Sequence, residues 1–343
     1  MRVSSWLGAE VLAENIPIAG GVFTESDDQE IPERVELTVP VSAAGAWWDP
    51  GTDTLHPLAR HGQRLYVVVD VANPRGDSWE MPLGWFGIQS WKIADDESTV
   101  SVVATGLLQL VADDTFARPE APKAGGTLAS EFRRLMSGGL PVDISTSLLD
   151  RACPGGFTWD EDRLAALYDI ADAWPARIAT NPDGTVMVLP PLGSTHESVL
   201  TLRDGEDGVL MSAPRDDTRE GVYTAVVASS SADSAASTPV SAEYQTTTGA
   251  YATDAYGVVR RRYSSPLLGS AAACLAAART IAEDSQRQGR VLTVTMPPDP
   301  RIQRGDAITL VWGGVNYRGW VQSVRLPLTV SGGAGVLTVG VPL

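Results

Sequence analysis

The feature that most constrains the fold is a helical segment near residues 271–287 that leads directly into closely spaced strands. Four apolar residues recur at i, i+4, i+7 and i+11, which predicts one apolar stripe on a helix: Ala271, Leu275, Ala278 and Ala282. Three charged residues at four-residue spacing, Arg279, Glu283 and Arg287, predict ion pairs on a solvated side. Gly289 is expected to end the helix.

The segment after this helix has the pattern of a small β-structure. Leu292, Val294 and Met296 alternate with polar residues, as on a half-buried strand. Gly313-Gly314 predicts a tight hairpin turn of the primed type, and residues 332–335 predict another. Four strands joined by such short connections would close into a small barrel or curled sheet.

The first 115 residues also indicate β-structure. Residues 34–39 alternate between apolar and polar, as do residues 65–71, and the acidic turn at 95–97 separates two further strands. The interval between Pro40 and Arg64 contains Trp47 and Trp48 and is expected to be an ordered excursion.

The middle of the chain combines helices and strands. Breaker-rich residues 118–126 predict a domain boundary. Helices are expected at 128–135 and 163–174, and strands at 178, 186–189, 200–202, 209–211 and 223–229. The serine- and alanine-rich residues 230–239 indicate a mobile loop. We therefore predict a mainly β fold with an α+β middle: a barrel-like domain at 1–115, a mixed domain at 116–215 and a second barrel-like domain at 216–343.

Charge and hydropathy exclude several classes of protein. The net charge of −16 argues against specific nucleic-acid binding, although an acidic surface is compatible with a conduit for DNA. The run Arg260-Arg261-Arg262 is interpreted as a solvated strand edge. No apolar run is long enough to span a bilayer, and Glu10 and Glu14 interrupt any signal-peptide core, so membrane insertion and secretion by that route are not expected.

The candidate reactive residues lack the companions that catalysis or metal binding requires. His56, His61 and His196 have no carboxylate or cysteine at zinc-site spacing. Cys153 and Cys274 cannot form a disulfide framework and are interpreted as a loop thiol and a small buried residue. We find no nucleophile elbow, phosphate-binding glycine loop or zincin motif, and we predict no catalytic, cofactor or metal residue.

Two acidic clusters and one aromatic pair allow alternatives. Asp160, Glu161 and Asp162 could form a glycosidase pair or a cation site, but charges at a helix start explain them more simply. Asp204, Glu206 and Asp207 do not follow the calcium-loop pattern. Trp47 and Trp48 could stack on sugars, form a contact hot spot, or plug the β-domain.

The order of segments in the second half resembles a known family. The polar residues 215–220 precede the strand at 221–227. Tyr256-Gly257, the alanine-rich helix, and the segments 292–294, 300–308 and 319–324 follow in that order. This order resembles the tail hub proteins of long-tailed bacteriophages and contractile injection machines. Residues 105–108, Thr-Gly-Leu-Leu, are similar to hub proteins of phages that infect actinobacteria. The basic residues are almost all arginine, Lys92 and Lys123 being the exceptions, which agrees with such a host.

The resemblance implies a structural role in the virion. In that family, two barrel-like domains per subunit let three copies match the six-fold ring of the tail tube. It implies a non-enzymatic homotrimer at the tail tip, assembled in the host cytoplasm, that contacts the tail-tube ring, the tape-measure protein and the central fibre or tip proteins while DNA passes through its lumen. The alternatives are a carbohydrate- or receptor-binding tail protein using Trp47 and Trp48, and a cell-wall hydrolase using Asp160.

Overall fold

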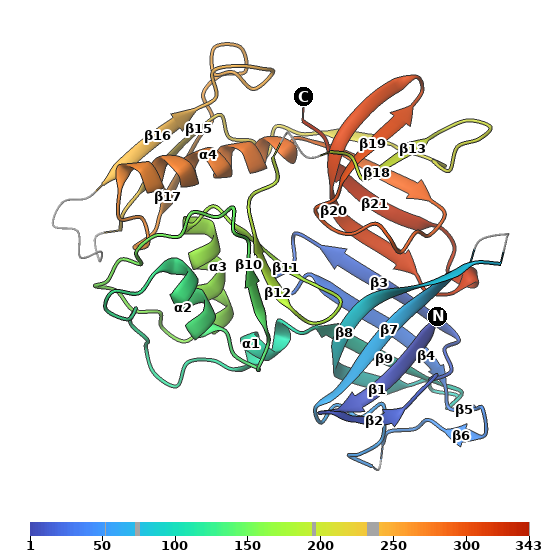
Figure 1. The fold of residues 1–343 in the computed structure, drawn as a ribbon. Coiled ribbons are helices and arrows are strands. Elements are labelled where there is room, and N and C mark those ends of the chain that lie inside the picture. Colours follow the sequence, from blue (N-terminus) through green and yellow to red (C-terminus); the bar gives the residue numbers. More distant parts are fainter. Residues whose placement is uncertain (52, 73–75, 194–196, 232–239, 343) are drawn as a thin grey trace.

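The chain forms a β lobe and an α/β lobe, as the computed structural model shows (Figure 1). The structure describes residues 1–343 except 52, 73–75, 194–196, 232–239 and 343. Both ends of the chain contribute strands to the β lobe, and the helices belong to the α/β lobe. None of the helices within the described residues is long and apolar enough to cross a membrane.

The N-terminal half of the β lobe is an antiparallel array with the order β3-β4-β9-β8-β7-β1-β2. Its strands are β1 (Arg2–Leu7), β2 (Glu10–Ala13), β3 (Gly20–Ser26), β4 (Glu33–Pro40), β7 (Gln63–Ala72), β8 (Ser78–Ile93) and β9 (Thr99–Gly106). Alternate residues of β4 are buried, as its period-two pattern predicts, and the acidic turn joins β8 to β9 as expected. The excursion at 41–63 is ordered in its described part and contains the small hairpin β5 (Ser42–Ala43) and β6 (Ala46–Trp47).

The C-terminal strands continue the same sheet instead of forming a separate barrel. They are β13 (Leu200–Arg203), β14 (Arg215–Asp217), β18 (Arg290–Met296), β19 (Ala307–Trp312), β20 (Val315–Pro327) and β21 (Gly335–Gly340). The two halves join where β20 pairs antiparallel with β3, from Ser323 opposite Ser26 to Pro327 opposite Val22. The result is a 13-stranded sheet. The mainly β class is confirmed, but no closed barrel is present among the described strands.

Turn chemistry determines part of this topology. Gly313 and Gly314 both have positive φ, 58° and 77°, which a type I′ hairpin requires and which glycine adopts without steric cost. This turn joins β19 to β20 as predicted. The connection from β20 to β21 contains a short 3₁₀ turn at Val330–Gly332 before the second glycine-rich bend. Residues 209–211, predicted as a strand, are not assigned to one of the named strands, although Met211 donates a backbone hydrogen bond to Thr295.

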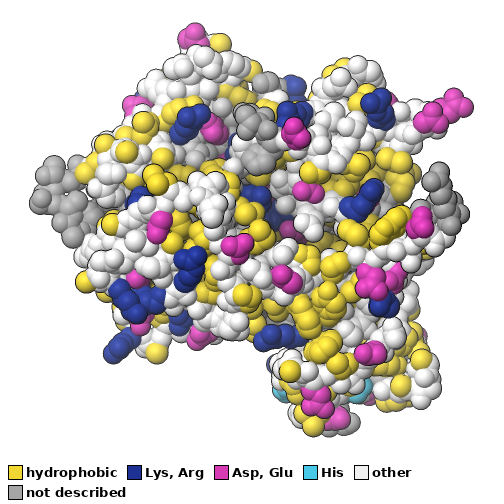
Figure 2. Space-filling view, in the orientation of Figure 1, with side chains coloured by type: hydrophobic (Ala, Val, Ile, Leu, Met, Phe, Trp, Pro, Cys, Tyr) yellow, Lys and Arg dark blue, Asp and Glu magenta, His cyan; other side chains and the backbone are white. Residues whose placement is uncertain are grey.

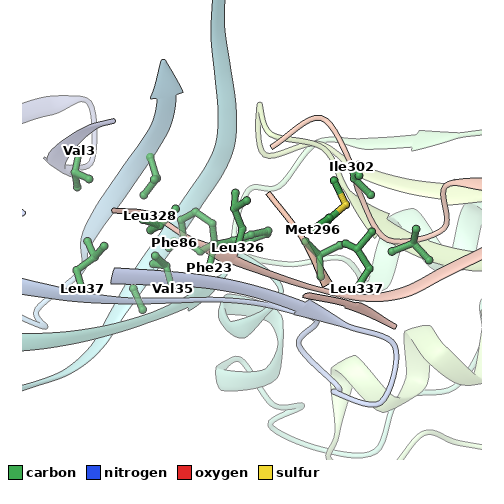
Figure 3. Close-up of a cluster of buried hydrophobic side chains, with 14 of the residues drawn as sticks. Val3, Phe23, Val35, Leu37, Phe86, Met296, Ile302, Leu326, Leu328 and Leu337 are labelled. Atoms are coloured by element: carbon green, nitrogen blue, oxygen red, sulfur yellow. The ribbon is translucent and has the colours of Figure 1, made fainter. Parts of the chain in front are cut away.

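The core of the β lobe crosses the junction between the two halves. Phe23 on β3 and Phe86 on β8 make an edge-to-face contact, with ring centroids 6.0 Å apart. Leu326 of β20 and Leu337 of β21 belong to the same buried cluster, which Figure 3 shows beside Phe23 and Phe86. The two ends of the chain are therefore held together by a common apolar core as well as by strand pairing.

The α/β lobe has a second core around three helices and a small mixed sheet. The helices are α1 (Gln109–Asp113), α2 (Leu128–Leu135) and α3 (Arg163–Ala173), and the sheet contains β10 (Val142–Ile144), β11 (Arg177–Thr180) and β12 (Val186–Leu189). Helix α1 was not predicted. Leu128, Phe132 and Leu135 of α2 are fully buried, as their spacing indicates.

A second sheet and the long helix complete this lobe. Strand β15 (Ala225–Ser229) lies between β16 (Ser241–Gln245) and β17 (Arg260–Ser264), and α4 (Ala271–Arg287) packs on β15 and β16. These elements share one apolar core with α2 and α3. The boundaries at 116 and 216 stay a prediction. Most of the predicted loop at 230–239, from 232 onward, lies outside the described residues.

The predicted apolar stripe of α4 is only partly the buried face, since Ala278 and Ala282 of that stripe are buried. Ala271 and Leu275 are exposed, Leu275 by 46%, while the buried side consists of Ala273, Cys274, Ala277, Ala278, Ala282 and Ser285. Arg279 pairs with Glu283 at 2.7 Å as expected. Arg287 instead pairs with Asp284 and lies 5.6 Å from the centre of the Trp320 ring, so it is not on the solvated side. Alanines occur on several sides of this helix, and the small face is the one that fits closely against the sheet.

Candidate functional site at the lobe interface

The two candidate tryptophans do not form a stacking pair. Trp47 is 64% exposed at the end of β6, whereas Trp48 is 7% exposed and belongs to the β-lobe core. The Trp48 indole donates to the Ala43 carbonyl at 3.2 Å and packs edge-to-face against His56. Trp48 thus packs residues 41–63 against the β-lobe core, and Trp47 is the exposed member of the pair.

The acidic clusters have structural partners. Asp162 accepts a 2.8 Å hydrogen bond from the Ala165 amide and caps the start of α3, which supports the helix-start interpretation. Asp160 and Glu161 lie exposed before this helix. Asp204 accepts from the Gly313 amide at 2.7 Å and so fixes the β19–β20 turn, while Glu206 and Asp207 are exposed. Among the described residues, no group of three or more His, Cys, Asp and Glu is arranged to hold a metal ion.

The candidate histidines and cysteines also lie in structural, non-catalytic surroundings. The His56 ring accepts from the Leu58 amide at 3.1 Å, and the His61 amide donates to Gln63 at 2.7 Å. His196 lies outside the described residues. The two cysteines are free and buried, and burial raises the pKa of Cys153 to about 11. A thiol with this pKa is almost entirely protonated near pH 7, so it is a poor nucleophile.

The predicted strand edge carries the basic run. Arg260, Arg261 and Arg262 are exposed on β17, an outer strand of its three-stranded sheet. Arg260 pairs with Glu243 at 2.9 Å, and the Arg261 guanidinium lies 5.2 Å from the centre of the Tyr223 ring. The run is therefore divided between an ion pair and a cation–π contact on a solvated edge, as predicted.

Sequence reasoning missed Arg304, a largely buried arginine with several partners at the interface of the two lobes. Arg304 lies in the loop between β18 and β19, and its side chain is only 10% exposed. Its guanidinium contacts Asp27 at 2.6 Å and Glu25 at 3.3 Å, and it donates to the Ile178 carbonyl of β11 at 3.1 Å. One arginine thus connects the C-terminal strands, the N-terminal strands and the α/β lobe. We call Arg304, Glu25, Asp27, Glu33 and Arg177 the interlobe cluster.

Glu33 is the buried acid of the interlobe cluster. It begins β4, is 7% exposed, and neither carboxyl oxygen has a hydrogen-bond partner among the described residues. Burial, with a smaller contribution from Glu25, raises its pKa to about 7, and Arg304 acts in the opposite direction. Gly106 at the end of β9 makes room for this side chain, because a Cβ there would lie 2.4 Å from a carboxyl oxygen of Glu33.

Arg177 is the basic residue of the cluster without an ion-pair partner in the described part of the chain. It begins β11, and its Nε is buried without a hydrogen-bond partner. Burial, followed by the nearby charge of Arg304, lowers its pKa. Gly305 lies directly against the guanidinium, since a Cβ at Gly305 would be 2.7 Å from Nη1.

Two cavities border Arg304 where the lobes meet. The smaller, about 60 Å³, is lined by Glu25, Glu33 and Thr180 among others. The larger, about 290 Å³, lies between α3, the end of α4 and β20, and Arg177, Arg287 and Trp320 line it. On the face shown in Figure 2, acidic and basic side chains are interspersed, without a large field of one sign. The interface can bind polar groups, and among the described residues that line it no nucleophile is paired with a base as in a hydrolase.

No local pattern in the sequence pointed to this site. Arg304 precedes a Gly-Asp pair between two buried strands, and its partners Glu25 and Asp27 are 279 and 277 residues away. Tyr168 adds a second link between the lobes, because its hydroxyl donates to the Glu30 carbonyl at 2.7 Å. Charged residues in turns are usually solvated, so burial of Arg304 could be recognised only after the lobes were placed.

No protein-family model and no curated protein matches the chain. Solved structures do match. A tail protein from Neisseria meningitidis MC58 has a TM-score of 0.65 and 14% identity, over 98% of this chain and 95% of that chain. The 43 kDa tail protein of prophage MuSo2 from Shewanella oneidensis has a TM-score of 0.65 and 12% identity, over 99% and 98%. Prophage tail protein gp18 from Listeria monocytogenes EGD-e has a TM-score of 0.61 and 11% identity, over 99% and 94%.

These likenesses define the class of fold. The match extends over nearly the whole length of each chain, so the β lobe, the α/β lobe and their connection are shared as one architecture. The chain therefore has the fold of these phage and prophage tail proteins. At 11–14% identity, the likeness concerns the fold, and function needs a separate argument.

Proposed function

We propose that this protein is a structural component of the tail of a long-tailed bacteriophage and that it is not an enzyme. The observation that carries this proposal is the full-length likeness to three tail proteins. The candidate acids support it, because Asp162 and Asp204 accept hydrogen bonds from backbone amides, which is a structural role. A virion part needs wide, rigid surfaces for neighbouring proteins and no reaction centre.

Within the tail, we propose the position of the hub at the tip. Three copies would form a trimer, and each would contact two tail-tube subunits, one through the N-terminal strands and one through the C-terminal strands. Continuity of the sheet across β3 and β20 supports this arrangement, because it fixes the two surfaces relative to each other. The partners would be the tube ring, the tape-measure protein and the central fibre or tip proteins.

The remaining features of the proposal follow from composition. A net charge of −16 would keep DNA from adhering as it passes through the lumen of the trimer. Assembly would occur in the host cytoplasm, and the near-absence of lysine supports an actinobacterial host.

The oligomeric state and the tube contact test this proposal. Light scattering should give three times the chain mass of 36.3 kDa, either for the protein alone or after addition of the tail-tube protein of the same phage. Electron microscopy of particles with this chain labelled should place the label at the distal end of the tail. A chain that stays monomeric with tube protein present, or a label along the tail shaft, would contradict the hub position.

A further inference from the structure

The larger interlobe cavity has a basic, donor-rich interior and an acidic rim. Arg177, Arg287 and Arg304 line it and are largely shielded from solvent, whereas Asp27, Asp172 and Asp284 line it and are exposed. Arg304 is paired with Asp27 and Glu25, and Arg287 is paired with Asp284. This pairing leaves Arg177 as the lining arginine without an ion pair among the described residues.

Arg177 lines this cavity beside Gly305. Its Nε is fully buried, and Gly305 lies against one side of the guanidinium. The terminal nitrogens Nη1 and Nη2 carry four N–H donors, which have no protein partner in the described part of the chain. Two parallel N–H groups of a guanidinium can bind a planar carboxylate in a bidentate geometry.

The other residues that line the cavity indicate what kind of carboxylate-bearing molecule would fit beside Arg177. Apolar walls come from Ile178, Pro191, Leu192 and the ring of Trp320, which is 4% exposed. The cavity of about 290 Å³ is just below the usual range for ligand sites, about 300–1,000 Å³, so it fits only a small ligand. Three exposed aspartates at the rim disfavour multiply charged anions and nucleic acid, because each added negative charge is repelled there.

We propose that this cavity is a binding site for a single carboxylate on a short apolar body, with Arg177 as the residue that binds the carboxylate. Such a group could come from the C-terminal residues of a polypeptide or from a free aliphatic acid. The site belongs to the isolated chain and does not depend on the proposed role in a phage tail.

Titration of the purified full-length chain tests this site. The probes are acetyl-Ala-Leu with a free carboxylate, the same peptide as its C-terminal amide, hexanoate and inorganic phosphate. Isothermal titration should detect the free-acid peptide or hexanoate, and the tighter of the two identifies the source of the carboxylate. The amide and phosphate should bind at least tenfold more weakly. Equal binding of acid and amide, binding of phosphate as tight as that of the best carboxylate, or no binding of either carboxylate at 10 mM would overturn the proposal.

Variants assign the binding to Arg177. Arg177→Gln should weaken carboxylate binding at least tenfold, while Arg301→Gln, at an arginine 65% exposed outside this cavity, should leave it unchanged. Arg177→Lys keeps the charge but loses the forked geometry, and should give an intermediate loss. Should Arg177→Gln fail to fold, the Arg177 Nε–Hε signal of the wild-type protein in NMR provides the readout. That signal should shift on addition of the acid peptide, and an unchanged signal would contradict the assignment.

Discussion

Arg304 illustrates what one buried arginine does in this molecule. It forms ion pairs with Glu25 and Asp27 of the N-terminal region and donates to the Ile178 carbonyl of the α/β lobe. Removing one partner of a buried ion pair leaves the others uncompensated, which typically costs about 3–5 kcal/mol. We expect Arg304→Ala to lower the free energy of unfolding by about that amount, measured by urea denaturation. The control Arg301→Ala removes a guanidinium that is 65% exposed from its pair with Asp299 and should cost less than about 1 kcal/mol. Equal effects of the two variants would show that the interlobe cluster does not hold the lobes.

Glu33 should make the stability depend on pH. Its pKa is raised from 4.5 to about 7, so between these values the folded protein binds a proton that the unfolded chain has lost. The free energy of unfolding should therefore fall as pH rises from 4.5 to 7, by about 3 kcal/mol at 1.36 kcal/mol per pKa unit, and level off above 7. Glu33→Gln should reduce this slope and leave the part that Asp172 contributes, because burial raises the pKa of Asp172 to about 6. Glu36→Gln, at a half-exposed acid of the same strand, should keep the full slope. Urea unfolding at pH 5, 6, 7 and 8 measures this, and identical slopes for Glu33→Gln and wild type would refute it.

At the scale of elements, α4 shows how a helix is positioned by small residues. Its buried side is made of alanine, cysteine and serine, which lets the helix approach β15 and β16 closely. Ala277 is 0% exposed, so Ala277→Leu should overpack this contact and cost about 1–3 kcal/mol. Leu275→Ala on the exposed side should change stability by less than about 0.5 kcal/mol. Thermal unfolding followed by circular dichroism compares the two. A larger loss for Leu275→Ala would mean that the other face of α4 is the buried one.

At the scale of the whole molecule, the two ends of the chain depend on each other. Without the C-terminal strands, β3 would expose an unpaired edge, and Phe23 and Phe86 would lose Leu326 and Leu337 from their buried cluster. We expect a fragment of residues 1–115 to aggregate or to bind a hydrophobic dye, while the full chain stays soluble and dye-free. Size-exclusion chromatography and dye fluorescence measure this. A monomeric fragment that unfolds cooperatively would show that the N-terminal half is an independent domain.

Local patterns predicted much of the secondary structure but none of the interlobe cluster. The alternation in β4, the stripe of α2 and the Gly313-Gly314 turn depend on residues a few positions apart, so the chain displays them directly. Ala271 and Leu275 of the predicted α4 stripe were misassigned, because small apolar residues occupy several sides of that helix. The pairing of β3 with β20 had no comparable signal, since nothing local selects a partner strand about 300 residues away.

The sequence by itself determined many of the strands, the tight Gly313-Gly314 turn, and that the chain is an acidic, mainly β protein with a helical middle. Short-range periodicity and backbone preferences are sufficient for those properties. The tertiary structure alone decided that both ends share one sheet, that Arg304 and Glu33 are buried, and that a cavity opens beside Arg177. These properties depend on contacts between distant residues, and the cost of burying a charge becomes evident only once its surroundings are assembled.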